Sequence, residues 1–135
     1  MLSALLALGL VLVAGCIQAE PETQAQIIED ITPEEAFALI ENNRGNPDFA
    51  ILDVRTPEEF ADGYIEGAIN LDYQAENFSG ELSKLDKNKT YLVYCRSGKR
   101  SAGALNIMAE LGFREVYNMT GGIIDWEEAG LATIQ

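Results

Sequence analysis

The hydrophobic positions of this chain lie in short continuous runs rather than in an alternating pattern. The runs are Phe49-Ala50-Ile51-Leu52 continuing into Asp53-Val54, Ala68-Ile69-Asn70-Leu71, Tyr91-Leu92-Val93-Tyr94 and Val116-Tyr117. Continuous hydrophobicity is typical of strands that are covered on both faces, as in a parallel sheet between layers of helices. The pattern therefore predicts such strands at these places.

Two segments between the runs carry the same signal for a helix start. Thr32-Pro33-Glu34-Glu35 and Thr56-Pro57-Glu58-Glu59 each offer a threonine N-cap, a proline at the first helical position and a glutamate three residues after the cap. A further helix is predicted from about Arg100 to Leu111, with Gly112 as its C-cap. Strands alternating with helices over residues 27–135 predict one α/β domain with an open, mainly parallel sheet flanked by helices.

The N-terminal residues 1–15 are almost wholly apolar. This run is too short to span a bilayer comfortably, but it suits the apolar region of a signal peptide. Its end, Val13-Ala14-Gly15-Cys16, resembles the lipobox of secreted lipoproteins. That resemblance implies a signal peptide at 1–15, a lipid on Cys16 and a tether at 16–26, with the domain held at the outer face of the cell membrane or in the periplasm. The alternatives are a simple secretory signal, an uncleaved anchor, or a buried N-terminal helix with a free Cys16.

The composition limits which residue types could carry out catalysis or bind a metal. The 135 residues include 22 acids and 9 bases, for a net charge of −13, which argues against broad nucleic-acid binding. The chain has no histidine, and Cys16 and Cys95 are too far apart for a CxxC redox pair or a four-ligand zinc site. We therefore expect no metal and no cofactor. Catalysis, if present, rests on Cys, Asp, Glu, Ser, Lys and Arg.

Cys95 lies where such chemistry is expected. It follows an apolar strand and precedes a short loop and a helix, and ligands of open α/β sheets bind at the carboxyl ends of the strands. The free amides at the start of that helix favour a thiolate or a small anion. Residues 87–109 also hold five of the nine bases and no acid. This local positive charge is expected to lower the pKa of Cys95 and attract anionic substrates, although an isolated cysteine can also be a buried structural residue.

Several segments resemble the signatures of rhodanese-like sulfurtransferases. Cys95-Arg96-Ser97-Gly98-Lys99-Arg100-Ser101 resembles the active-site loop of that family. Further matches are Leu52-Asp53-Val54-Arg55 with Glu58-Glu59-Phe60, Gly63-Tyr64-Ile65-Glu66-Gly67-Ala68-Ile69-Asn70, and Gly121-Gly122-Ile123-Ile124-Asp125-Trp126. These motifs, in this order, span nearly the whole domain.

The resemblance implies a persulfide mechanism. Cys95 would take sulfur from a small anionic donor such as thiosulfate and pass it to cyanide, a thiol or a protein cysteine. Loop amides from Arg96 to Ser101 would cradle the sulfur, Arg100 would hold a donor oxyanion, and Arg96 and Lys99 would attract the donor. The substrate-binding residues predicted in this way are Arg96, Ser97, Gly98, Lys99, Arg100 and Ser101.

Other polar residues near the strand ends have supporting roles in this interpretation. Asp53 is expected to order the catalytic loop by accepting backbone N–H bonds. Arg55 is expected to be mainly structural, in an ion pair with Glu59. Trp126 is expected in the core rather than in the site.

Two other functions remain open. The first is a cysteine phosphatase or the related arsenate reductase, which need five residues between cysteine and arginine. Here Arg100 follows Cys95 after only four, so the loop is tight for phosphate. The second is a non-catalytic domain that binds a partner or only carries sulfur.

Overall fold

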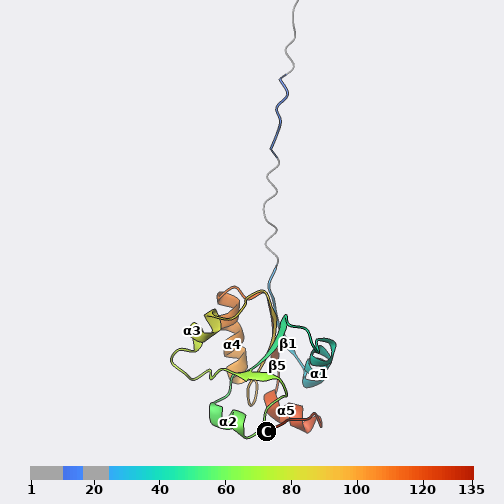
Figure 1. The fold of residues 1–135 in the computed structure, drawn as a ribbon, viewed down its shortest axis with the longest axis vertical. Helices are drawn as coiled ribbons and strands as arrows, with labels where there is room; N and C mark the ends of the chain where they lie inside the picture. The colour runs from blue at the N-terminus through green and yellow to red at the C-terminus, as the bar shows by residue number, and fades with distance from the viewer. Residues whose placement is uncertain (1–10, 17–24) are drawn as a thin grey trace, which may run out of the picture.

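A five-stranded parallel sheet organises the protein (Figure 1). The structure, a computed structural model, describes residues 11–16 and 25–135. The strands lie in the order β1-β5-β4-β2-β3. The elements in chain order are β1 (Ile27–Ile31), α1 (Pro33–Asn42), β2 (Phe49–Asp53), α2 (Pro57–Ala61), β3 (Ala68–Asn70), α3 (Phe78–Ser83), β4 (Thr90–Tyr94), α4 (Lys99–Glu110), β5 (Glu115–Met119) and α5 (Gly122–Glu128). The predicted fold class is confirmed.

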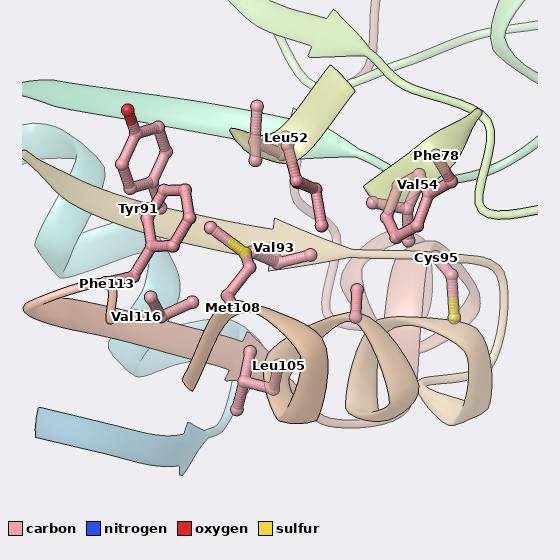
Figure 2. Packing of buried hydrophobic residues seen from close by; sticks show 12 residues of the cluster. Leu52, Val54, Phe78, Tyr91, Val93, Cys95, Leu105, Met108, Phe113 and Val116 are labelled. Atoms are coloured by element: carbon pink, nitrogen blue, oxygen red, sulfur yellow. The ribbon is translucent and has the colours of Figure 1, made fainter. Parts of the chain in front are cut away.

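Helices cover the sheet on both faces, with α3 and α4 on one side and α1 and α5 on the other (Figure 1). Successive strand residues point to opposite faces. Leu52 and Val93 therefore pack with α3 and α4, as Figure 2 shows for that face, whereas Ile51 and Leu92 pack with α1 and α5. This double burial explains why the central strands are continuously hydrophobic.

The predicted helix signals act as expected. Thr32 and Thr56 each accept a hydrogen bond from the backbone of the third helical residue, and each glutamate at that position accepts one from the threonine amide. At the end of α4, Gly112 has φ +86° and follows the C-cap, and the Phe113 amide donates to the Met108 carbonyl at 3.0 Å. This is a Schellman ending, in which a left-handed glycine stops the helix.

Three elements, β1, α3 and α5, were missing from the sequence prediction. β1 is an edge strand whose residues are mostly exposed, so it lacks the continuous apolar run by which the other strands were recognised. α3 is a helix of 6 residues, and its asparagine N-cap makes no side-chain capping bond. α5 follows Gly121, which has no side chain to cap the helix. All three elements therefore lack strong local signals.

The predicted signal peptide and tether lie largely outside the described residues. Residues 11–16 are exposed and carry no helix or strand, and Cys16 is an exposed free thiol. Across 11–16 and 25–135, no helix is both long and apolar enough to cross a membrane.

Candidate active site

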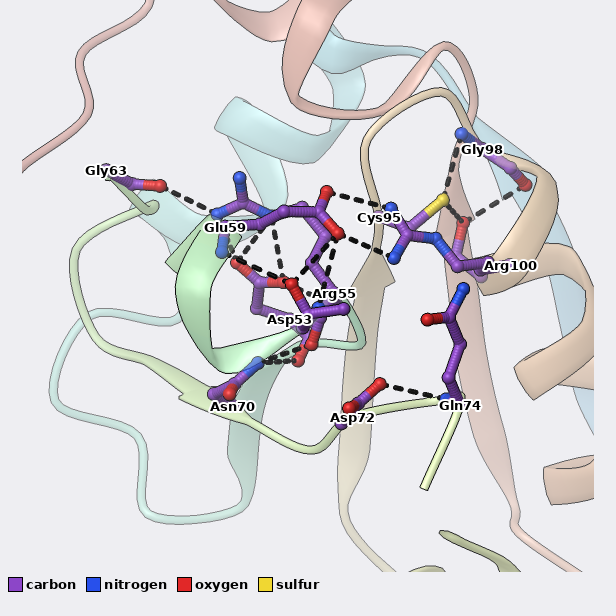
Figure 3. A network of polar contacts seen from close by, with 12 residues as sticks. Asp53, Arg55, Glu59, Gly63, Asn70, Asp72, Gln74, Cys95, Gly98 and Arg100 are labelled. Atoms are coloured by element: carbon purple, nitrogen blue, oxygen red, sulfur yellow. Dashed lines mark hydrogen bonds and ion pairs between the residues drawn. The ribbon is translucent and has the colours of Figure 1, made fainter. Parts of the chain in front are cut away.

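Cys95 lies in the first position after β4, between the sheet and the start of α4 (Figure 2). Its side chain is buried, with 1% of the residue's surface exposed. The Gly98 amide donates to Cys95 Sγ at 3.1 Å, and the Ser101 hydroxyl donates to the same sulfur at 3.4 Å (Figure 3). The sulfur thus lies at the N-terminal end of α4, where donors stabilise negative charge.

The environment of Cys95 favours the thiolate. Burial raises the pKa of the Cys95 thiol, but hydrogen bonds from the Ser101 hydroxyl and from loop amides outweigh this effect, so the pKa lies below its ordinary value. The contributing amides are those of Ser101, Gly98 and Ser97. The sequence predicted this direction from the local surplus of bases. In the structure, hydrogen bonds around the sulfur are the main cause of the lowering.

The backbone of the loop is anchored by the start of α5. The amides of Ile123 and Ile124 donate to the carbonyls of Cys95 and Arg96 at 2.9 and 3.2 Å. This contact requires glycine at position 122, where φ is +61° and a Cβ would lie 2.3 Å from the Arg96 carbonyl oxygen. The Gly121-Gly122 motif therefore fixes the active loop, a role that the sequence alone did not reveal.

Asp53 has a different role from the one predicted. Its carboxylate accepts hydrogen bonds from the backbone and side chain of Arg55, not from residues 96–101 (Figure 3). The Asp53–Arg55 ion pair is 2.6 Å long and buried, and Arg55 also donates to the Gly63 carbonyl. The predicted ordering of the catalytic loop by Asp53 is therefore wrong. The pair instead joins the end of β2 to the loop before β3.

The predicted ion pair between Arg55 and Glu59 is also wrong. Glu59 instead pairs with Arg100, 41 residues further along the chain, through bonds from Nη1 to Oε1 at 2.8 Å and from Nη2 to Oε2 at 2.9 Å (Figure 3). The Arg55 guanidinium instead forms its ion pair with Asp53, which is fully buried. The first-turn arginine of α4, predicted to face a donor anion, therefore already faces a carboxylate. The partly exposed pair has 20% and 29% of its side chains accessible.

The remaining loop bases lie at the rim. Arg96 and Lys99 are exposed, and Arg96 lines a cavity of about 460 Å³ together with Glu59, Arg55, Ile123 and Glu127. The loop thus borders an open cavity that is lined by both acidic and basic side chains. No group of three or more Cys, His, Asp or Glu side chains within the described residues is arranged to hold a metal ion.

Comparison with known proteins agrees with this architecture. The model of the rhodanese-like domain family matches residues 32–129. A sulfurtransferase of Allochromatium vinosum is 36% identical over 87 residues, which cover 64% of this chain and 79% of that protein. A rhodanese-related protein from Thermoplasma volcanium has a similar crystal structure, with a TM-score of 0.64 and 30% identity over 78% of this chain and 97% of that one.

A further solved structure bears on the phosphatase alternative. A protein of unknown function from Rhodopseudomonas palustris, described as a possible tyrosine phosphatase, has a TM-score of 0.64 at 29% identity, covering 79% of this chain and 85% of that one. The family match spans strands β2 to β5, the Cys95 loop and the Gly121-Gly122 turn. This chain belongs to the rhodanese-like domain family, and the relatives that it matches include proteins named sulfurtransferases.

Proposed function

We propose that the protein transfers sulfane sulfur through a persulfide on Cys95. In the first half-reaction the Cys95 thiolate attacks the outer sulfur of a donor such as thiosulfate. The S–S bond of the donor breaks, its electron pair leaves with sulfite, and a new S–S bond forms on Cys95. In the second, an acceptor such as cyanide or a thiolate attacks the outer sulfur and releases the Cys95 thiolate. Neither step needs an external oxidant or reductant.

One observation carries this proposal: Cys95 Sγ receives hydrogen bonds from Gly98 and Ser101 at the start of α4. Donors arranged in this way stabilise the thiolate before attack and the anionic persulfide after it. The family membership and the sulfurtransferases among the relatives support the same reaction. Arg96, Ser97 and Lys99 would form the rim that meets the donor.

A mass spectrum of the full chain after thiosulfate treatment tests the proposal. We expect a gain of one sulfur atom on Cys95, reversed by cyanide with release of thiocyanate. Cys95→Ser should lose both signals, whereas Cys16→Ser, which removes the only other cysteine, should keep them. Sulfur that loads but never leaves would indicate a carrier, and an unmodified Cys95 with every donor would indicate a binding domain.

The phosphatase alternative has its own measurement. Arg100 follows Cys95 after four residues, and its guanidinium is paired with Glu59 rather than free to enclose a phosphoryl group. Release of phosphate from an aryl phosphate, lost in Cys95→Ser, would instead assign the loop to phosphate chemistry.

We also propose that the chain is exported and anchored by a lipid on Cys16. The Val13-Ala14-Gly15-Cys16 sequence and the exposure of Cys16 support this proposal. Mass spectrometry of the protein from membranes of its host should find Cys16 as the lipid-modified first residue. Cys16→Ser should release the domain from the membrane fraction, and an intact Met1 with an unmodified Cys16 would contradict the proposal.

A further inference from the structure

The two capping boxes of this chain are alike in sequence but not in surroundings. Glu35 and Glu59 occupy the same position in Thr-Pro-Glu-Glu, and each accepts a bond from the amide of its own threonine. Glu59 also accepts hydrogen bonds from both Nη atoms of Arg100. A capping box does not require this second bond, so Glu59 has a role that Glu35 does not share.

The Glu59–Arg100 pair lies beside the reactive sulfur. Arg100 precedes Ser101, whose hydroxyl donates to Cys95 Sγ, and Figure 3 shows its guanidinium between the Glu59 carboxylate and the Cys95 side chain. Both Nη atoms of Arg100 point to Glu59, in the two-point geometry by which arginine also binds oxyanions. The carboxylate therefore occupies the face of Arg100 that a donor oxyanion would use.

We propose that Glu59 is a specificity-determining residue that masks Arg100, so that the site binds doubly charged sulfur donors more weakly than singly charged ones. The proposal rests on the sulfurtransferase function proposed above. A dianion such as thiosulfate must displace a carboxylate that is already tethered beside its partner. It also meets the negative charge of Glu59 itself, and this repulsion grows with the charge of the incoming anion.

The fold holds Glu59 in the position in which it covers Arg100, so their ion pair is more than a chance contact between mobile surface side chains. Glu59 Oε1 is held from the other side by the amide and hydroxyl of Thr56, at 3.4 and 3.2 Å. The carboxylate is thus fixed by α2 while Arg100 is fixed by α4. A side chain held at both ends competes more strongly with a free anion than a mobile one does, because less conformational entropy is lost on pairing.

Paired donors provide the first test. Thiosulfate carries two charges, and methanethiosulfonate, which transfers the same outer sulfur and leaves as a sulfinate, carries one. In Glu59→Gln, which keeps an oxygen for the Thr56 cap, we expect KM for thiosulfate to fall about fivefold, the upper range for a partly exposed ion pair. KM for methanethiosulfonate should fall less. Glu35→Gln, the matched variant, should change neither.

The proposal would be overturned if KM for thiosulfate were the same in Glu59→Gln and Glu35→Gln. It would also be overturned if KM for thiosulfate were higher in Glu59→Gln than in the parent. An equal fall in KM for thiosulfate and for methanethiosulfonate in Glu59→Gln would also overturn it, because the proposed discrimination depends on the charge of the donor.

A second measurement does not require sulfur transfer. In a Cys16→Ser background, neutral iodoacetamide alkylates Cys95, and the sulfate dianion should slow that reaction by occupying the site. The sulfate concentration for half protection should be about fivefold lower in Glu59→Gln than in the parent. The same value in both would overturn the mask even if Cys95 forms a persulfide. A lower value without any persulfide would instead contradict the proposed function and leave the anion mask established.

Discussion

Ser101 places its hydroxyl between the sulfur of Cys95 and the carbonyl of Gly98, at 3.4 and 3.1 Å. The residue is fully buried in the first turn of α4, so its hydroxyl is directed toward the sulfur by the helix itself. This contact is the largest single cause that lowers the pKa of Cys95, against the raising effect of burial. Ser101 therefore links the start of the helix to the reactivity of the thiol.

Replacing this hydroxyl should make the thiol less acidic. Ser101→Ala removes a hydrogen-bond donor that stabilises the thiolate, so we expect the pKa of Cys95 to rise. The pH dependence of alkylation by iodoacetamide measures the change. Ser83→Ala is the control because the Ser83 hydroxyl donates to the Gly80 carbonyl in the same way but lies on α3. An equal shift in both variants would refute the role of Ser101.

The contact of Gly122 with the active loop gives a second prediction. Gly122→Ala should lose most of the sulfur-transfer rate, because a Cβ would lie 2.3 Å from the Arg96 carbonyl oxygen and force the loop away. Gly130→Ala has a similar positive φ of +78°, with nothing within 4 Å of the added carbon. We expect the free energy of unfolding of Gly130→Ala to fall by only about 1 kcal/mol, the cost of a positive φ at a residue with a side chain. Its sulfur-transfer rate should stay unchanged. Urea unfolding and thiocyanate formation compare the two variants, and equal rates would contradict the anchoring role.

The elements that the sequence predicted well are those whose signals are local. The capping threonines, the glycine after α4 and the apolar run of β4 each act through neighbours within a few residues, and all were placed correctly. The partner of Glu59 could not be assigned in this way, because Arg100 lies 41 residues further along the chain. Arg100 reaches Glu59 only because parallel strands bring the ends of β2 and β4 to one edge of the sheet, a relation that depends on strand order and register. Strand β1 was missed because its acids, Glu29 and Asp30, interrupt its apolar residues.

The buried pair of Asp53 and Arg55 should matter more for stability than any surface pair. Asp53→Asn leaves the buried Arg55 guanidinium without a compensating charge, and we expect the free energy of unfolding to fall by about 3 kcal/mol. Glu81→Gln breaks an ion pair with Lys84, whose side chain is 72% exposed, and should cost less than about 1 kcal/mol. Urea midpoints measure both, and similar losses would mean that Asp53 is dispensable to the fold.

The pairing of Glu59 with Arg100 also predicts how stability depends on acid. The Arg100 hydrogen bonds lower the pKa of Glu59 from 4.5 to about 2, against the raising effect of its partial burial. A carboxyl group whose pKa is lower in the folded state stabilises the fold above its unfolded pKa, and this contribution is lost as the pH falls toward the folded value. The stability advantage of the parent over Glu59→Gln should therefore be full above pH 4.5 and shrink as the pH falls toward about 2.

Urea unfolding at several pH values between about 6 and 3 measures that difference. Arg100→Gln supplies the control because it removes the cause of the lowered pKa while leaving Glu59 in place. In that background, the difference between glutamate and glutamine at position 59 should vary much less over the same range. A difference that stays constant with pH in the parent background would mean that Arg100 does not hold the Glu59 carboxylate in solution. That result would also contradict the proposal that Glu59 masks Arg100, because the mask depends on this ion pair.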